Sequence, residues 1–544
     1  MHAYEKFLND CKRIAGAHAH ILEKPKSGIA DLALPCFSFS QPIEEAKKLA
    51  EKYQKKKSMM IGNVFATGPY VNFFIDEKKF SAAAIKEILK EKEKYGKGKK
   101  KGRIMVEYSA PNSNKPLHVG HLRNDSIGMA VSNILAFSGC KVIRANLVSD
   151  RGIHICKTML AYKKWGGGTP EKKPDHFVGD FYVLFEKNKT KEMEEEAQKM
   201  LVDWEKNNKE VKALWKKMNS WVLSGFKETY EKFGSEFDVW FYESEFYDSA
   251  KPIISKGLKK GVFFKDNEGS VVAKLEPLPD KAVLRKDGTS IYITNDLSLT
   301  VNKFKKYKLD KSIWVVASEQ NLYFQQLFRI FELLGYKWAK NCCHLSYGLV
   351  HLPSGRMKSR EGTVIDADDL LNEVKNLAKK EIHKRGLLDG QKTEKRALSI
   401  ALAAIKYFFL KVEPKSDMLF DPEKAISFEG NTGPYLQYTY ARASSILKKA
   451  GKKKGKIKYE ESMMALIKNL AQFPEEIERA AKDCKPNYIA NYLYELATLF
   501  NEYYHKERVL GSKNEFARLQ LVEAVRIVLG NGLKLLGIEP LEEM

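Results

Sequence analysis

The chain has 544 residues, of which 44% are hydrophobic and 11% aromatic. At roughly 150 residues a domain, this length predicts three or four domains and enough apolar surface for a packed core, which excludes a single small module and a disordered chain. Lys and Arg number 93 against 69 Asp and Glu, a net charge of +24. Such an excess favours a polyanionic partner, nucleic acid before an anionic membrane, because neutralising phosphates releases condensed counterions.

Segments rich in lysine and glycine divide the chain into three predicted domains. Residues 91–103 form a charged linker that closes an N-terminal domain of residues 1–100. A central domain of residues 101–415 follows. The C-terminal domain, residues 416–544, is interrupted by a second basic run. Amphipathic periodicity predicts that this region is a helix bundle, with helices over residues 398–410, 435–449, 489–504 and 516–536.

The central domain begins with an alternation of strands and helices. Residues 103–108 predict a strand, and residues 117–137 predict a helix with Pro116 suited to its first turn. Further strands are predicted at 141–148, 290–294 and 312–317, the second after an Asp287-Gly288 turn. This pattern favours a doubly wound α/β sheet of parallel strands, whose ligand would lie beyond the carboxyl ends of the strands. A charged, Trp-rich stretch at about 163–242 has helical periodicity and is interpreted as a helical insertion.

Cysteine usage and hydropathy restrict the location of the protein. Seven cysteines include no C-x-x-C pair, which suits a reducing compartment and argues against structural zinc. The longest nearly apolar run, residues 398–410, is short of the about 20 residues that span a bilayer. The N-terminus lacks the apolar region of a signal peptide. We therefore expect a cytoplasmic protein without a membrane span.

Two short segments carry signals for phosphate chemistry. His118 and His121 lie three residues apart at a predicted helix start, where unpaired backbone N–H groups attract phosphate, and Gly120 lets a ligand approach the backbone closely. The alternative is two ordinary surface histidines. About 240 residues later, G-R-M-K-S-R-E-G-T-V-I (355–365) is a basic loop that could clamp a polyphosphate, although such a loop alone is more often solvated surface.

Together, the two segments resemble the signatures of class I aminoacyl-tRNA synthetases called HIGH and KMSKS. The resemblance sharpens to the arginyl-tRNA synthetases and covers essentially the whole chain. It is carried by E-Y-S-A-P-N-S-N-K-P-L-H-V-G-H-L-R (107–123), Y-I-T-N-D (292–296), A-S-E-Q (317–320), G-P-Y-L-Q-Y-T-Y-A-R (433–442) and the final L-L-G-I-E-P-L-E-E-M. It implies a multidomain α/β protein: an α+β N-terminal tRNA-binding domain, a Rossmann-like catalytic domain and an all-α anticodon-binding domain.

The resemblance also implies the reaction. L-Arginine would attack the α-phosphate of ATP to give arginyl-adenylate and pyrophosphate, and the arginyl group would then pass to tRNA(Arg) with release of AMP. We expect Mg²⁺ to enter with ATP and no zinc, because no acidic metal cage is evident. We expect a monomer, and activation that depends on bound tRNA, as is general in this family.

A guanidinium is a planar fork of donors, so its selective capture needs carboxylates in its plane. The family's arginine-binding pair falls on Glu107 and Asp296, with Tyr292 beside the aliphatic stem. Taken alone, either carboxylate would as readily be a helix cap or a surface ion pair. The resemblance places Asn112 and Gln320 at the α-amino and carboxylate ends of the substrate, with Ser109 in the same loop; as lone polar residues these would more often form loops and caps.

The phosphate-binding residues include one departure from the class I pattern. The resemblance assigns catalysis to His118 and His121 at the α-phosphate, and to Lys115 and the loop Arg356, Met357, Lys358, Ser359 and Arg360 at the leaving pyrophosphate. Gly120, Met357 and Ser359 would also bind ATP. Ser359 stands where the second lysine of K-M-S-K-S is usual, and a hydroxyl cannot supply that charge. We favour Lys115 as the replacement because it precedes a helix N-terminus; Lys358 is the competitor.

Aromatic residues in both outer domains resemble the family's tRNA contacts. In A-T-G-P-Y-V-N-F-F, Tyr70 and Asn72 match residues that contact the tRNA elbow, where a ring can stack on an unstacked base. The alternative is that alternating Tyr and Phe in a strand form core. The anticodon contacts fall on Tyr435, Tyr438, Tyr504 and the terminal Met544; for the tyrosines, bundle packing is the alternative.

Two rival functions remain to be compared with this interpretation. A noncatalytic tRNA-binding relative would lack the site residues, and all of them are present. A class I synthetase for another amino acid would lack the paired carboxylates. No hydrolytic site is evident in the insertion, and we expect no editing activity, since a site with buried carboxylates already rejects substrates without matching donors.

Overall fold

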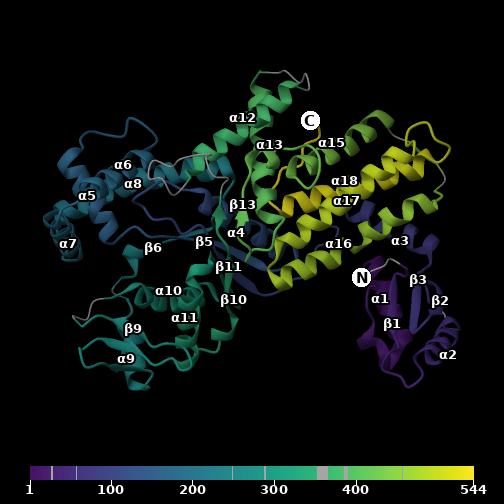
Figure 1. Cartoon of the computed structure of the whole chain (residues 1–544), viewed down its shortest axis with the longest axis horizontal. Helices are drawn as coiled ribbons and strands as arrows, with labels where there is room; N and C mark the ends of the chain where they lie inside the picture. The colour runs from purple at the N-terminus through teal and green to yellow at the C-terminus, as the bar shows by residue number, and fades with distance from the viewer. Residues whose placement is uncertain are drawn as a thin grey trace.

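The N-terminal part of the computed structural model is an α+β unit (Figure 1). The structure describes residues 1–25, 29–56, 58–247, 249–286, 290–351, 365–384, 390–451, 453–455 and 457–544. Three antiparallel strands in the order β1-β3-β2 pair with each other. The elements of this unit are α1 (Ala3–Ala15), β1 (Leu32–Pro35), α2 (Pro42–Gln54), β2 (Ile61–Thr67), β3 (Tyr70–Ile75) and α3 (Glu77–Glu91). Helices α1 and α3 also contact the C-terminal helices, which joins the two outer parts of the chain.

A five-stranded parallel sheet forms the centre of the molecule (Figure 1). Its strands are β4 (Arg103–Glu107), β5 (Lys141–Val148), β6 (Val239–Tyr242), β10 (Lys311–Ala317) and β11 (Cys342–Tyr347), in the order β11-β10-β4-β5-β6. All four neighbouring pairs are parallel. The chain moves outward from β4 to β6 and then returns to β10 on the other side. This reversal confirms the doubly wound sheet and places its crevice between β4 and β10.

Helix α4 (Val119–Phe137) lies between the sheet and the C-terminal helices. It begins two residues later than predicted, with His118 as its N-cap. Most of the helix is buried, and the absence of a side chain at Gly128 lets the ring of Tyr108 lie against its backbone. The start of α4 is therefore held by packing on several sides.

The helical insertion projects from the sheet as α6 (Pro174–Asn188), α7 (Lys191–Glu205) and α8 (Lys209–Phe233), packed on α5 (Ile153–Trp165) (Figure 1). The helical prediction is wrong for residues 239–242, which form β6 and pair with β5. The run Val-Trp-Phe-Tyr suits an extended strand better than a helix, because bulky and β-branched side chains pack well on a pleated surface.

The predicted strand at residues 290–294 is also wrong, because helix α10 (Tyr292–Tyr307) begins there. The hydroxyl of Thr294 accepts a hydrogen bond from the backbone N–H of Ile291, the cap residue, at 2.9 Å. This local cap outweighs the β-propensity of Ile-Tyr-Ile. The preceding Asp287-Gly288 turn lies outside the described residues. Helix α10 is preceded by α9 (Lys251–Lys259) and a small antiparallel sheet of β7 (Phe263–Lys265), β8 (Val271–Ala273) and β9 (Lys281–Leu284), and α11 (Asn321–Leu333) follows β10.

The C-terminal part is helical, as predicted. Its elements are α12 (Ala367–Lys384), α13 (Gly390–Leu410), α14 (Pro422–Ala425), α15 (Gly433–Ala450), α16 (Met464–Asp483), α17 (Pro486–Lys506) and α18 (Glu515–Leu535). The four predicted amphipathic segments correspond to α13, α15, α17 and α18, whereas α12, α14 and α16 are additional helices. A short pair, β12 (Val350–His351) and β13 (Met418–Leu419), connects this part to the sheet. Within the described ranges, no helix combines the length and the apolar character that crossing a membrane requires.

Candidate active site

Polar side chains from four neighbouring strands gather at the carboxyl edge of the central sheet. Glu107 ends β4, Ser149 follows β5, Glu243 follows β6, and Gln320 follows β10. The carboxyl ends of parallel strands share one edge, so these residues face the same region, where α/β sheets bind their ligands. Asp296, in the first turns of α10, has its carboxylate beside this group.

Asp296 and Glu243 are two half-buried residues whose carboxyl groups influence each other electrostatically. Burial raises the pKa of Asp296 to about 6, although a hydrogen bond from the hydroxyl of Tyr323 opposes the shift. Burial likewise raises the pKa of Glu243 to about 7, and the negative charges of Asp296 and Asp150 add to that shift. Glu243 Oε1 accepts a hydrogen bond from Ser149 at 2.8 Å. The region therefore favours a cation with several donors, since a cation would offset both desolvated charges.

Glu243 does not stand out in the sequence, because the pattern predicts that residues 239–242 continue a helix. Once β6 is recognised as a strand of the sheet, the first residue after it becomes a candidate site residue. Tyr292, which was predicted, lies near Glu243; its side chain is 64% exposed, and burial of the hydroxyl with the negative charge of Glu243 raises its pKa. Its ring can cover a ligand from the solvent side.

Glu107 is already paired in the structure. The ammonium of Lys303, from α10, donates to Glu107 Oε2, and both side chains are almost fully buried. The same ammonium lies 4.8 Å from the ring centre of Phe241. Lys303 therefore balances the charge of Glu107. The sequence, in contrast, predicts the same arginine-binding role for Glu107 and Asp296. The contact joins residues far apart in sequence, and the motif alone does not reveal it.

The remaining predicted arginine-binding residues differ in their surroundings. Asn112 and Gln320 are exposed at the carboxyl edge of the sheet, in accord with roles at a ligand. Ser109 lies deeper: its side chain is buried, and its hydroxyl shares a 2.7 Å hydrogen bond with Tyr230 of α8. Its backbone N–H donates to Asn124 at 2.7 Å and its φ is +75°. Ser109 thus holds the loop in a strained conformation through the core.

His118 and His121 form a pair at the N-terminus of α4. Their ring centroids lie 3.9 Å apart. His118 Nδ1 accepts from the Gly120 N–H at 3.1 Å, and His121 Nδ1 accepts from the His118 N–H at 3.1 Å. Because each Nδ1 is an acceptor, each neutral ring carries its proton on Nε2 and can donate from there. Burial, followed by the charge of Lys115, lowers the pKa of His118 to about 4, and burial lowers that of His121 as well.

The predicted loop residues Arg356, Met357, Lys358, Ser359 and Arg360 lie outside the described residues, and the chain on both sides of them is attached to α4. Before them, the guanidinium of Arg123 donates to the carbonyl oxygens of Gly348 and Leu349 at 2.7 and 3.1 Å. After them, residue 119 donates its backbone N–H to the Ile365 carbonyl at 2.9 Å. The helix that carries both histidines therefore also fixes the two ends of this segment.

One group of described residues has the spacing of a metal site: Asp175, His176 and Asp368. The ammonium of Lys173 lies between the two carboxylates, 3.0 Å from Asp175 and 2.6 Å from Asp368. This ammonium already supplies the positive charge that a metal ion would bring. The donor set therefore does not fit a resident metal ion.

The two predicted tRNA contacts of the N-terminal part lie on β3. Tyr70 packs edge-on against Phe37, which is 62% exposed, with centroids 5.2 Å apart. Asn72 is buried to 4% exposure and lies opposite Phe65 of β2, which is exposed. This edge of the sheet therefore presents aromatic rings at the surface around a recessed amide.

In the C-terminal part, Tyr438, Tyr504 and Met544 line one cavity of about 980 Å³ together with Arg442. The guanidinium of Arg442 lies 4.8 Å from the Tyr438 ring and 5.5 Å from the Tyr504 ring. Tyr435 does not line this cavity. Its hydroxyl accepts from Asn501 Nδ2 at 2.9 Å, so it packs α15 against α17, which was the alternative interpretation.

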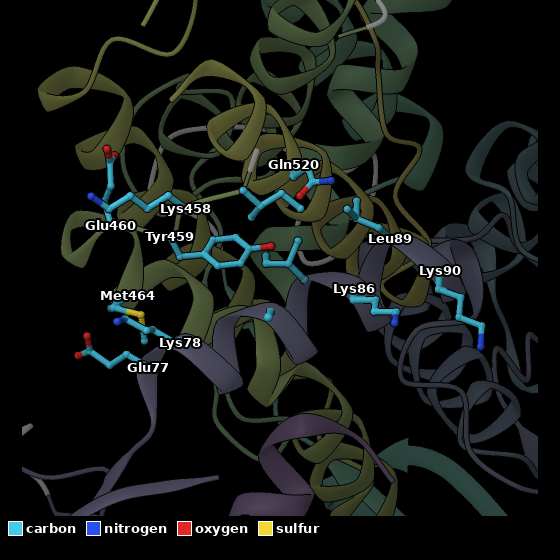
Figure 2. Close-up of a pocket in the computed structure, with 13 residues that line it drawn as sticks. Glu77, Lys78, Lys86, Leu89, Lys90, Lys458, Tyr459, Glu460, Met464 and Gln520 are labelled. Carbon is cyan, nitrogen blue, oxygen red and sulfur yellow. The ribbon is translucent and has the colours of Figure 1, made fainter. Parts of the chain in front are cut away.

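A second cavity, of about 690 Å³, lies between α3 and the residues around the start of α16 (Figure 2). Its walls combine Leu89, Tyr459 and Met464 with the lysines Lys86 and Lys90 of α3. None of the residues predicted from the sequence lies there. The cavity belongs to the junction between the N-terminal and C-terminal parts.

Comparison with known proteins gives matches along the whole chain. The family model "tRNA synthetases class I (R), catalytic domain" matches residues 84–422, and the model "DALR anticodon binding domain" matches residues 436–544. An arginine–tRNA ligase from Treponema denticola is 43% identical, over 98% of this chain and 96% of the relative. One from Bacteroides thetaiotaomicron is 46% identical, over 80% of each. The arginyl-tRNA synthetase structure from Thermus thermophilus superposes with a TM-score of 0.84 at 25% identity, covering 99% of this chain and 100% of that one.

Proposed function

The chain belongs to the class I arginyl-tRNA synthetases, and from that premise we propose how its own side chains divide the work of the reaction. It attaches L-arginine to tRNA(Arg) with ATP, through an arginyl-adenylate, and releases pyrophosphate and AMP. The proposals below concern which residues bind each substrate, where the metal enters, and how the chain is divided into domains.

The guanidinium of arginine binds between Asp296 and Glu243, with the ring of Tyr292 over the aliphatic stem. Support comes from the burial of both carboxyl groups, since two desolvated acids with raised pKa values suit a ligand that brings a positive charge and planar donors. Glu107, held by Lys303, accepts a further donor at the pocket floor. Asn112 and Gln320 hold the α-amino and carboxylate ends.

ATP lies over the N-terminus of α4, with its phosphates against Gly120. The Nε2–H groups of His118 and His121 donate to the oxygens of the α-phosphate, where negative charge grows as the arginine carboxylate attacks. Both rings are neutral at pH 7 and need no proton from solvent for this role. Mg²⁺ enters with ATP, and we propose no resident metal and no zinc.

The leaving pyrophosphate is held by Lys115, and by the loop residues Arg356, Met357, Lys358, Ser359 and Arg360, for which the family motif is the support. Lys115 precedes the α4 N-terminus and lies close enough to lower the pKa of both histidines. This placement supports Lys115 over Lys358 as the replacement for the missing loop lysine.

tRNA(Arg) contacts the two outer parts of the chain. Its elbow stacks on Tyr70, with Asn72 reading a base edge, and its anticodon enters the cavity of Tyr438, Tyr504 and Met544. Aromatic rings near a guanidinium are the usual surface for unstacked bases. We drop Tyr435 from the direct contacts, because its hydroxyl is engaged by Asn501.

We also propose the division into residues 1–100, 101–415 and 416–544, a monomeric state and a cytoplasmic location. The cysteines support the location: none of the seven forms a disulfide, which suits a reducing compartment. The domain limits rest on the charged linkers and on the bounds of the central sheet.

The observation that carries the assignment of the chemistry is the histidine pair with both Nε2–H groups free to donate. The test is adenylate formation, followed as arginine-dependent exchange of pyrophosphate into ATP with tRNA(Arg) present. We expect His118→Asn and Lys115→Ala to slow exchange by about a hundredfold or more, the size of effect seen when a group aimed at developing charge is removed. Near-normal exchange in Lys115→Ala with a crippled Lys358→Ala would assign the pyrophosphate to Lys358.

A further inference from the structure

The helical insertion shares a buried ionic cluster with the start of α12. We call Lys173, Asp175, His176, Thr229 and Asp368 the insertion cluster. Lys173 Nζ lies 3.0 Å from Asp175, 2.6 Å from Thr229 and 2.6 Å from Asp368, so its three protons are all engaged. His176 Nε2 lies 3.4 Å from Asp368 Oδ2. The cluster therefore connects α6 and α8 of the insertion to the start of α12.

The charges of the cluster are mutually compensated in a mostly dry environment. Asp175 is fully buried, and the Asp368 side chain is 10% exposed. Burial by itself would raise the pKa of Asp368, but the bonds from His176 and Lys173 outweigh it and leave this pKa well below its usual range. The bond to Asp368 raises the pKa of His176. Lys173 and His176 therefore stabilise the ionised form of Asp368, and Asp368 stabilises the protonated forms of Lys173 and His176.

The start of α12 is in turn bonded to the start of α4. Asp366 caps α12, with Oδ1 accepting from the N–H of Asp368 at 2.8 Å, and its Oδ2 lies 3.4 Å from His176 Nε2. The Ala367 N–H donates to the Leu117 carbonyl at 3.0 Å, and residue 366 forms a β-bridge with His118. Lys173 is thus connected to the backbone of His118 through Asp368 and the start of α12.

Helix α6 also touches the loop before α4 directly. A methyl group at Gly179 would lie 2.8 Å from Pro116 Cδ and 3.6 Å from the Cα of Lys115. A methyl group at Gly225 of α8 would lie 2.3 Å from Asp175 Oδ1. The two glycines allow α6 to lie against the signature loop on one side and against α8 on the other.

From these contacts we infer that Lys173 and His176 are positioning residues for adenylate formation: the insertion sets the location of Lys115 and His118 through Asp368 and the start of α12. The insertion thereby has a task in the first step of the reaction. This inference rests on the roles proposed above for Lys115 and His118.

A buried ion pair is weak evidence for stability, because the cost of desolvation can exceed the attraction between the charges. A role in positioning explains the cluster better, since the three protons of Lys173 point to acceptors on three different helices. A role in stability and a role in positioning predict different results for a variant in which Lys173 and the carboxylates that it balances have all lost their charges.

The experiment measures arginine-dependent pyrophosphate exchange by the full chain with tRNA(Arg) present, together with the melting temperature. We expect Lys173→Met to lower kcat by about tenfold or more, because a misplaced reacting group costs at least that much, with the KM for arginine and the affinity for tRNA unchanged. Lys172→Met is the matched control; Lys172 pairs with Asp180 at the surface, and we expect its kcat within about twofold of wild type.

The triple variant Lys173→Met/Asp175→Asn/Asp368→Asn separates positioning from stability. It removes the ammonium together with both carboxylates that it balances, so no buried charge is left unpaired and the melting temperature recovers toward the wild-type value. It does not restore the link between the helices, so kcat stays low. Recovery of kcat together with the melting temperature would overturn the inference, as would a normal kcat in Lys173→Met. His118→Asn is measured in parallel: normal exchange there would refute the proposed catalytic role itself, whereas slow exchange there with normal exchange in Lys173→Met would refute only the positioning.

Discussion

At the scale of single residues, the site is distinguished by carboxyl groups that are buried before the substrate arrives. Asp296 and Glu243 have lost most of their water, and Tyr323 and Ser149 each supply one compensating hydrogen bond. A buried carboxylate gains most from a partner that brings both charge and directed donors, which a guanidinium does. Neutral isosteres of arginine lack the charge, so the site that we propose would bind them less well than arginine.

The raised pKa values predict a pH dependence for arginine binding. Asp296 titrates at about 6 and Glu243 at about 7 in the empty site, so both are protonated below these values and cannot pair with a guanidinium. We expect the affinity for arginine to be highest above pH 7 and to weaken as the pH falls through 7 and then 6, with protons released on binding. Calorimetric titration in two buffers of different ionisation enthalpy measures both effects; a constant Kd without proton release would refute the assignment.

The sequence indicates some of these residues and not others, for a physical reason. His118 and His121 lie in one short motif and Tyr292 and Asp296 in another, and the spacing within each motif already places its two residues close together. The partnership of Lys303 with Glu107 joins two distant segments through the packing of α10 on the sheet, and local spacing does not specify it. The hydrogen bond between Ser109 and Tyr230 is equally invisible to local spacing, because Tyr230 belongs to the insertion.

At the scale of elements, the sequence pattern predicted the long helices and the strands β4, β5 and β10, and it was wrong for two short segments. Residues 290–294 have the β-branched composition of a strand, and the cap formed by Thr294 starts a helix instead. Residues 239–242 follow a long helix and were read as its continuation, although pairing with β5 makes them a strand. Short apolar runs are ambiguous until the tertiary partner is known.

The packing of α4 on β4 depends on the glycine at position 128. A methyl group there would lie 2.2 Å from Cγ of Tyr108, whose hydroxyl donates to the carbonyl of Glu236. We expect Gly128→Ala to lower the free energy of unfolding by about 1 to 3 kcal/mol, the usual cost of an extra methyl group in a packed core. Gly167→Ala is the control, since a methyl group there meets no atom within 4 Å. Equal denaturant midpoints for the two variants would contradict this packing.

At the scale of the whole molecule, the N-terminal, central and C-terminal parts serve a single reaction. In our proposal, the sheet and α4 bind the small substrates, and tRNA contacts Tyr70 in the N-terminal part and the cavity lined by Tyr438 in the C-terminal part. The family motifs indicated this division, whereas the contacts of α3 with α16 and α18 and the role of the insertion could not be predicted. Contacts between domains depend on surfaces that no short motif records.

The net charge of +24 leads to a prediction for tRNA binding. Each phosphate that a lysine or arginine neutralises releases counterions, so we expect log Kd to rise linearly and steeply with log salt concentration. Filter binding of tRNA(Arg) at several salt concentrations measures the slope. Arg442→Gln should weaken binding and reduce the slope, whereas a flat dependence for the wild type would exclude phosphate contacts as the main source of affinity.

We propose that carboxylates at the sheet edge select arginine by its charge. The most direct measurement compares arginine with its neutral isostere citrulline in tRNA-dependent pyrophosphate exchange, for the wild type and for Asp296→Asn. Loss of one charge-assisted contact costs about 1.5 to 3 kcal/mol. We therefore expect Asp296→Asn to reduce the preference for arginine over citrulline by about tenfold to a hundredfold, with the KM for ATP unchanged. An unchanged preference, or an equal loss of ATP binding, would contradict the claim.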